Sequence, residues 1–164
     1  MSPWRALTVP YATIILGSII PAVFLVDSVP IIPPLGYLFL LCWRIMRPGL
    51  LPLWIGVPLG IIDDIFSGQP FGSAILLWSL TMIALEAIET RFPWRGFWQD
   101  WFTAGLAIVL YILAAMMVSG TNPTPVLTFA VLPQIALSIV LYPVMARFVS
   151  RLDGFRLAHS RRIG

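Results

Sequence analysis

Six apolar segments, joined by connections that are alternately rich and poor in arginine, restrict this chain to a narrow set of folds. The chain has 164 residues, of which 59% are hydrophobic. A helix needs about 20 apolar residues to cross a bilayer, so the length allows five or six spans and no separate soluble domain. The second and third segments are the shortest. The segments cover approximately residues 7–26, 31–46, 50–66, 71–88, 102–118 and 126–148.

The arginines distinguish between the possible numbers of spans. All ten basic residues are arginines, and none lies in the connections at 26–30, 67–70 or 119–125. With six spans every arginine falls on one side of the membrane, whereas five spans would divide them between the two sides. Because basic residues are enriched in cytoplasmic loops, that side is expected to be cytoplasmic. The arginines are Arg5, Arg44, Arg47, Arg91, Arg95, Arg147, Arg151, Arg156, Arg161 and Arg162.

The predicted fold is an all-α, polytopic membrane helix bundle with six transmembrane helices and both termini in the cytoplasm. We expect one integral membrane domain over residues 1–150. A basic cytoplasmic tail over residues 151–164 is expected to lie along anionic lipid or to extend into solution.

The connection at 91–101 is rich in tryptophan and arginine. We expect it to lie in the inner membrane interface, where amphipathic aromatic rings are half hydrated. Just before it, Glu86 and Glu89 are expected to be neutralised locally by the arginines that follow, Arg91 and Arg95, with Glu86 within approximate helical reach of Arg91 and Glu89 placed less directly. The interfacial rings are those of Trp94, Trp98 and Trp101.

The sequence lacks the residues that most enzymatic or metal chemistry requires. Cys42 and His159 are the only cysteine and histidine, so a disulfide within the chain and a Cys/His zinc site are both excluded. P-loop, nucleophile-elbow and His-Glu-x-x-His signatures are absent. The formal net charge of +3 indicates membrane topology rather than nucleic-acid binding. We therefore expect no catalytic residues, no metal, no cofactor and no nucleic-acid partner.

The densest chemistry lies at the end of the third segment. Gly56, Gly60 and Asp64 are spaced by four residues, so they share one helix face on which the glycines allow close approach of another helix. Asp63 lies about 100° around the helix, and adjacent helical residues make a poor catalytic carboxylate pair. A carboxylate near a helix C-terminus opposes the macrodipole. Asp64 therefore needs donors from the turn amides, from Ser67 or from a partner chain, or else it faces water.

These residues carry a resemblance to a known family. The pattern Gly60-x3-Asp64-x2-Ser67-Gly68-x3-Gly72 is similar to the most recognisable motif of the MreD family, polytopic rod shape-determining proteins of the bacterial inner membrane. Upstream, Trp43 and the Arg47-Pro48 pair match the same family, as do the length, the six spans and the short basic tail. Asp63 departs from the pattern, because an apolar residue is more usual beside the motif aspartate.

The resemblance implies a non-enzymatic inner-membrane scaffold. Such proteins bind the bitopic protein MreC and act in the elongasome with MreB, RodA and a penicillin-binding transpeptidase to direct lateral peptidoglycan synthesis. The candidate partner-binding residues are those of the shared glycine face and the following turn. They are Gly56, Gly60, Asp64, Ser67, Gly68 and Gly72.

Two other functions remain open at this point. One is the solute-binding membrane subunit of an energy-coupling-factor vitamin transporter, which needs a cavity with convergent polar groups. Asp63, Asp64, Ser67 and Gln69 supply some of these groups. The other, a lipid-modifying enzyme, lacks an evident nucleophile or metal set.

Overall fold

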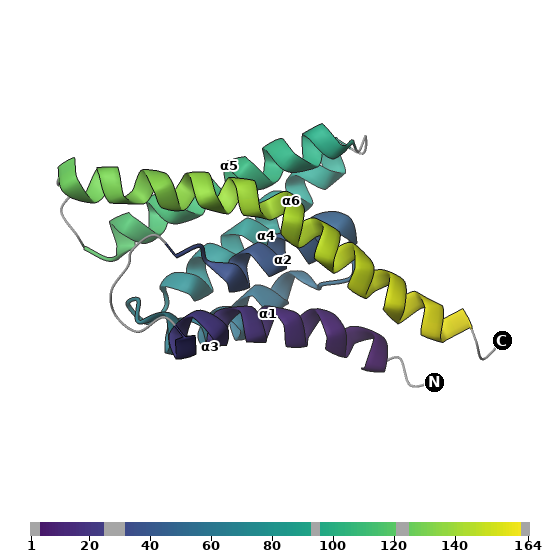
Figure 1. Ribbon diagram of the computed structural model, residues 1–164. Coiled ribbons are helices and arrows are strands. Elements are labelled where there is room, and N and C mark those ends of the chain that lie inside the picture. The colour runs from purple at the N-terminus through teal and green to yellow at the C-terminus, as the bar shows by residue number, and fades with distance from the viewer. Residues whose placement is uncertain (1–3, 25–31, 93–95, 121–124, 162–164) are drawn as a thin grey trace.

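The computed structural model describes residues 4–24, 32–92, 96–120 and 125–161, and these residues form a helical bundle (Figure 1). Two helical elements begin directly after a proline: Pro34 precedes an α-helix, and Pro52 precedes a short 3-10 helix. Proline is favoured at the start of a helix. The elements in order are α1 (Trp4–Phe24), α2 (Leu35–Met46), η1 (Leu53–Ile55), α3 (Gly56–Ser67), α4 (Ser73–Arg91), α5 (Phe97–Val118) and α6 (Pro125–Arg161).

Successive helices run in alternating directions through the bundle. The first turn of α1 and the last turn of α6 lie at one end, which we call the terminal end, and the turn between α3 and α4 lies at the opposite end, the motif end (Figure 1). Since every element of the described residues is helical, the prediction of an all-helical fold is confirmed. The predicted connection at 26–30, Trp94, Arg95 and most of the connection at 119–125 lie outside the described residues.

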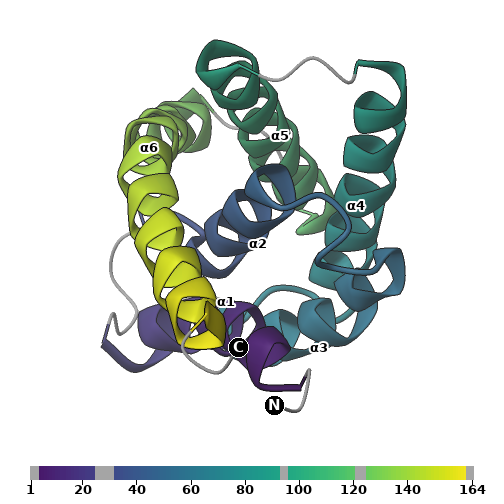
Figure 2. The same cartoon turned by 90° about the vertical axis from the view of Figure 1, so that its right-hand side faces the viewer.

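The short helix α2 lies at the centre of the bundle, with the other helices arranged around it (Figure 2). Its side chains are buried on nearly all sides, including Tyr37, Leu41 and Trp43. Apart from Arg44, the helix is made of apolar and aromatic residues and glycine, as expected at such a central position. Its 12 residues extend only about 18 Å, which is shorter than the hydrocarbon core of a bilayer.

The helices of the described residues differ in whether they are long enough to cross a membrane. The helical stretches Ser73–Arg91, Phe97–Val118 and Val131–Phe155 are long and apolar enough to cross a membrane. Thr8–Val23 and Leu35–Met46 are shorter apolar stretches. Helix α3 is also short, with 12 residues after η1.

Two boundaries differ from the sequence predictions. Residues 97–101 are the first turn of α5 rather than part of the connection before it, because Gly96 is the extended residue at which that helix begins. Trp101 donates from Nε1 to the Ile139 carbonyl oxygen at 3.4 Å, so its ring is held against α6. Helix α6 is continuous through residue 150 and ends at Arg161.

Glycines set the closest approach between α1 and α2. A Cβ added to Gly17 would lie 3.1 Å from the Gly36 Cα, so the two backbones cross where neither residue has a side chain. This crossing had no signal in the sequence, because the two glycines belong to different helices and form no spacing motif.

Candidate functional site

The Asp64 carboxylate lies at the N-terminus of the following helix. The side chain extends from α3 and accepts hydrogen bonds from residues at the start of α4. Its Oδ2 accepts from the Gly72 amide at 2.8 Å. Its Oδ1 accepts from the Ala74 amide at 2.8 Å and from the Ser73 hydroxyl at 3.1 Å. The Ile75 amide approaches Oδ2 at 3.4 Å. An α-helix leaves its first amides without an internal partner, and this carboxylate faces three of them, whereas the Ser73 amide donates to the Pro70 carbonyl oxygen.

This arrangement explains the charge at position 64. The residue at the N-cap position of α4 is Gly72, which has a φ of 100° and no side chain to cap the helix, so Asp64 caps it from a distance. Although the carboxylate opposes the dipole of α3, it complements the dipole of α4. Asp64 is only 5% exposed. The expectation that the turn amides supply its donors is confirmed, and the alternative of a water-facing carboxylate is wrong.

The glycine face of α3 is in contact with α4 of the same chain. A Cβ on Gly56 would lie 3.0 Å from the Ser79 Cα, and one on Gly60 would lie 2.6 Å from the Ile75 Cα. Real Cβ atoms do not approach backbone atoms as closely as the second value, so a side chain at position 60 must push the helices apart. The close approach predicted for this face is therefore satisfied within the chain.

Replacing Gly60 by alanine is expected to destabilise the fold by about 1–3 kcal/mol, because the added methyl group overpacks the contact between α3 and α4. The matched control is Gly105→Ala in α5, where a Cβ meets nothing within 4 Å and where the change should add up to about 1 kcal/mol of stability. Unfolding by sodium dodecyl sulfate in mixed micelles, followed by tryptophan fluorescence, measures both. Equal stability of the two variants would contradict the contact.

The turn that follows the glycine face presents an exposed surface at the motif end. Ser67 and Gly68 are exposed, whereas Gly72 is partly buried. The left-handed φ of 68° at Gly68 ends α3 in the usual way. Two aromatic rings accompany the turn, Phe66 at 40% and Phe71 at 73% exposure. Of the predicted partner-binding residues, Ser67 and Gly68 are thus accessible, and Gly56, Gly60 and Asp64 are buried.

Asp63 points away from the α4 cap and toward α1 and α2. It is buried, and its carboxylate lies beside Ser18 of α1 and Gly36 of α2. It also lines a cavity of about 450 Å³ at the motif end. The two adjacent carboxylates therefore have different neighbours, as the helical period requires.

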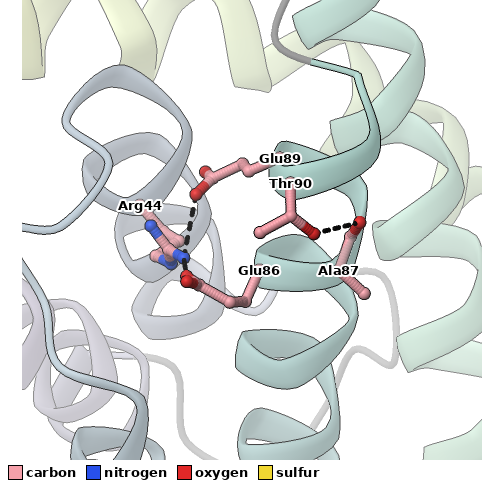
Figure 3. Close-up of polar contacts among 5 residues, drawn as sticks. All are labelled: Arg44, Glu86, Ala87, Glu89 and Thr90. Carbon is pink, nitrogen blue, oxygen red and sulfur yellow. Dashed lines mark hydrogen bonds and ion pairs between the residues drawn. The ribbon is translucent and has the colours of Figure 1, made fainter.

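A second polar centre joins α2 to α4. Figure 3 shows Glu86 and Glu89 of α4 converging on Arg44 of α2. The Arg44 Nη2 forms an ion pair with Glu86 and another with Glu89 Oε2 at 2.9 Å. Arg44 is 1% exposed, so it belongs to the interior of the bundle and not to a connection. The sequence predicted local neutralisation of the two glutamates by a following arginine, whereas the contact between helices brings them a cation from α2.

A third ion pair ties α2 to α6. Arg47, which follows the last turn of α2, donates from Nε to Asp153 Oδ2 at 2.8 Å. Asp153 is buried, and it lies beyond the predicted domain boundary at residue 150. The beginning of the predicted tail is thus held to the bundle by one of the residues that carried the family resemblance.

Trp43, the other upstream residue of the resemblance, is also internal. It is fully buried, and its Nε1 donates to Thr13 Oγ1 of α1 at 2.9 Å. Thr13 Oγ1 in turn lies 2.9 Å from the Pro10 carbonyl oxygen. A buried indole needs an acceptor, and α1 supplies it. The described residues contain no group of three potential metal ligands.

The motif residues thus form contacts between helices. The chain as a whole matches one protein family. A family model described as rod shape-determining protein MreD matches residues 2–152. The chain belongs to the MreD family. This confirms the resemblance read from Gly60, Asp64 and the following turn. Comparison with curated proteins and with solved structures gave no match.

Membership in the MreD family makes this chain a rod shape-determining membrane protein, with a structural rather than a known enzymatic role. The apolar helices agree with a membrane location. Sequence reasoning missed the Arg44 cluster, since the pairing depends on the packing of α2 against α4. Its only sequence signal was an arginine two residues before the end of an apolar helix.

Proposed function

We propose that this MreD family member is a non-enzymatic scaffold of the bacterial elongation complex that binds MreC in the inner membrane. The observation that carries the proposal is the family match over residues 2–152. The fold supports it, because the polar residues of the motif serve to hold helices together rather than to form a reactive centre. Links to MreB, RodA and a penicillin-binding transpeptidase would be indirect.

The proposed topology has six spans and places the terminal end in the cytoplasm. The arginines after α2 and along the last part of α6 support this orientation, since basic residues are retained on the cytoplasmic side. Arg47, Arg147 and Arg151 are exposed, as residues at a headgroup surface should be. The motif end then lies at the periplasmic surface, on the side where the family resemblance places most of MreC.

Two surfaces are suited to MreC. At the motif end, Ser67, Gly68 and Phe71 are exposed and suit the segment where MreC leaves the membrane. Between α4 and α5 lies an apolar groove of about 280 Å³, which is lined partly by small residues such as Ala84, Ala107 and Ala114. Small residues favour close helix packing in lipid, so the groove suits the single MreC helix. Gly56 and Gly60 do not line these surfaces; they allow α3 to pack closely against α4, which contributes to the groove.

Photocrosslinking tests the proposal in living cells. A benzophenone amino acid replaces Phe71 on the turn or Leu80 on the groove, and Phe148 of α6 is the exposed control position. We expect MreC adducts from positions 71 and 80 and only traces from position 148. If MreC co-purifies but forms adducts mainly at position 148, the surface assignment is wrong. If MreC does not co-purify at all, the scaffold proposal fails.

The solute-binding subunit of a vitamin transporter is the second candidate. The cavity beside Asp63, with a volume of about 450 Å³, is the observation in its favour, because small-molecule sites are typically of this size. A vitamin retained in native mass spectra of the purified chain would favour this reading over the scaffold.

A further inference from the structure

The cavity at the motif end contains the carboxylate of Asp63, whose side-chain partner within the bundle is the neutral hydroxyl of Ser18. Asp63 is 8% exposed, and within the described residues it takes part in none of the ion pairs of the bundle, which involve Arg44 and Arg47. An ionised carboxylate removed from water is costly unless it is paired with a cation. Asp64, by comparison, is fully engaged by α4.

The glycine at position 36 lets α2 pack closely beside the Asp63 carboxylate and the Ser18 hydroxyl at one wall of the cavity. A Cβ added to Gly36 would touch Ser18 Oγ and would lie 3.2 Å from Asp63 Oδ1. Any side chain at position 36 would therefore intrude between the carboxylate and Ser18. The cavity walls come from five helices, α1, α2, α3, α5 and α6, and from the segment before α2, so the space lies between helices of the bundle.

The chemistry of the walls selects the kind of ligand. Among the described residues that line the cavity, Asp63 is the only carboxylate and there is no arginine. Neutral hydrogen-bonding groups surround it, supplied by Ser67, Gln69 and Gln134. Such a site complements a compact cation with several N–H donors and offers no charged partner for an anion.

We propose that this cavity binds a primary ammonium group, with Asp63 as its counter-ion. Two sources offer this chemistry at a membrane surface: the headgroup of phosphatidylethanolamine and a free amine such as ethanolamine. The cavity of about 450 Å³ is within the range of small-molecule sites. The counter-ion itself is distinct from the surfaces proposed for MreC: Asp63 is buried and does not line the groove between α4 and α5, whereas Ser67 and Gly68 belong both to the cavity wall and to the exposed turn.

Lipid retention by the purified full-length chain tests the site. The protein is exchanged into nanodiscs of equal phosphatidylethanolamine and phosphatidylglycerol, released into the gas phase, and its bound lipids are counted by native mass spectrometry. We expect about a tenfold preference for phosphatidylethanolamine, since a hydrogen bond to a charged group is worth that much. Asp63→Asn should abolish the preference and leave phosphatidylglycerol binding unchanged.

A second measurement, of unfolding temperature, distinguishes the lipid headgroup from the free amine and shows whether the variant is folded. In phosphatidylglycerol alone, ethanolamine should raise the unfolding temperature of the wild type if the site takes the free amine, and should have no effect if it takes only the lipid. Asp63→Asn is expected to unfold at the same temperature as the wild type or higher, because it removes a buried charge. The proposal is overturned if the wild type shows neither a lipid preference nor an ethanolamine effect, or if both persist in Asp63→Asn.

Discussion

The double variant Glu86→Gln/Glu89→Gln is expected to lose about 3–5 kcal/mol of stability, because it leaves a buried guanidinium without a counter-ion. Arg44 is 1% exposed and its Nη2 contacts both carboxylates, whereas its Nε and Nη1 have no hydrogen-bond partner among the described residues. The two glutamates are therefore its main compensation. Unfolding by sodium dodecyl sulfate, followed by tryptophan fluorescence, measures the loss.

Removing the unpaired guanidinium of Arg44 from the double variant should restore stability. Adding Arg44→Met to the double variant is expected to recover most of the loss, because replacing a buried charged side chain that has lost its counter-ions by an apolar one of similar volume removes the cost of the unpaired charge. The triple variant therefore has to be more stable than the double one. If Arg44→Met destabilises the double variant further, Arg44 contributes chiefly by packing and the ion cluster is not what joins α2 to α4.

Asp64→Ala is expected to cost about 3 kcal/mol, which combines the loss of a helix cap with buried amides left unsatisfied. The amides concerned are those of Gly72 and Ala74 at the start of α4, both 2.8 Å from the carboxylate. Asp64→Asn should cost less, since one acceptor oxygen remains. Thermal unfolding in detergent, without MreC present, measures both variants.

Ser67→Ala is the matched control for the capping prediction. Ser67 is a small polar residue in the same turn, but it is exposed, so its loss should change stability by no more than about 0.5 kcal/mol. If Asp64→Ala and Ser67→Ala unfold alike in the absence of MreC, the aspartate does not act inside the chain.

Much of the fold could be predicted because hydropathy and glycine spacing are local signals. Each of the six apolar segments corresponds to one α-helix of the described residues, and the spacing of Gly56 and Gly60 predicted a close helix contact. The predicted start of α5 was too late, because the aromatic and polar residues at 97–101 resemble a connection. The helix begins after the extended Gly96, and Trp101 packs on α6.

The site was only partly predictable, since its partners come from distant parts of the sequence. The need of Asp64 for donors followed from the helix dipole, but the identity of α4 as their source required the turn at Gly68 and Gly72. The pairing of Arg44 with two glutamates and the proximity of Asp63 to Gly36 depend on how α2 inserts between its neighbours. No spacing in the sequence encodes that insertion.

The central claim is that the family motif acts first within the chain, with Asp64 holding the start of α4. Hydrogen–deuterium exchange of residues 71–76 in the purified protein without MreC tests it most directly. Asp64→Ala should increase deuterium uptake at the Gly72, Ala74 and Ile75 amides, which face the carboxylate, and Ser67→Ala should not. Unchanged uptake in Asp64→Ala, together with loss of MreC binding, would instead make Asp64 a direct partner contact and contradict the claim.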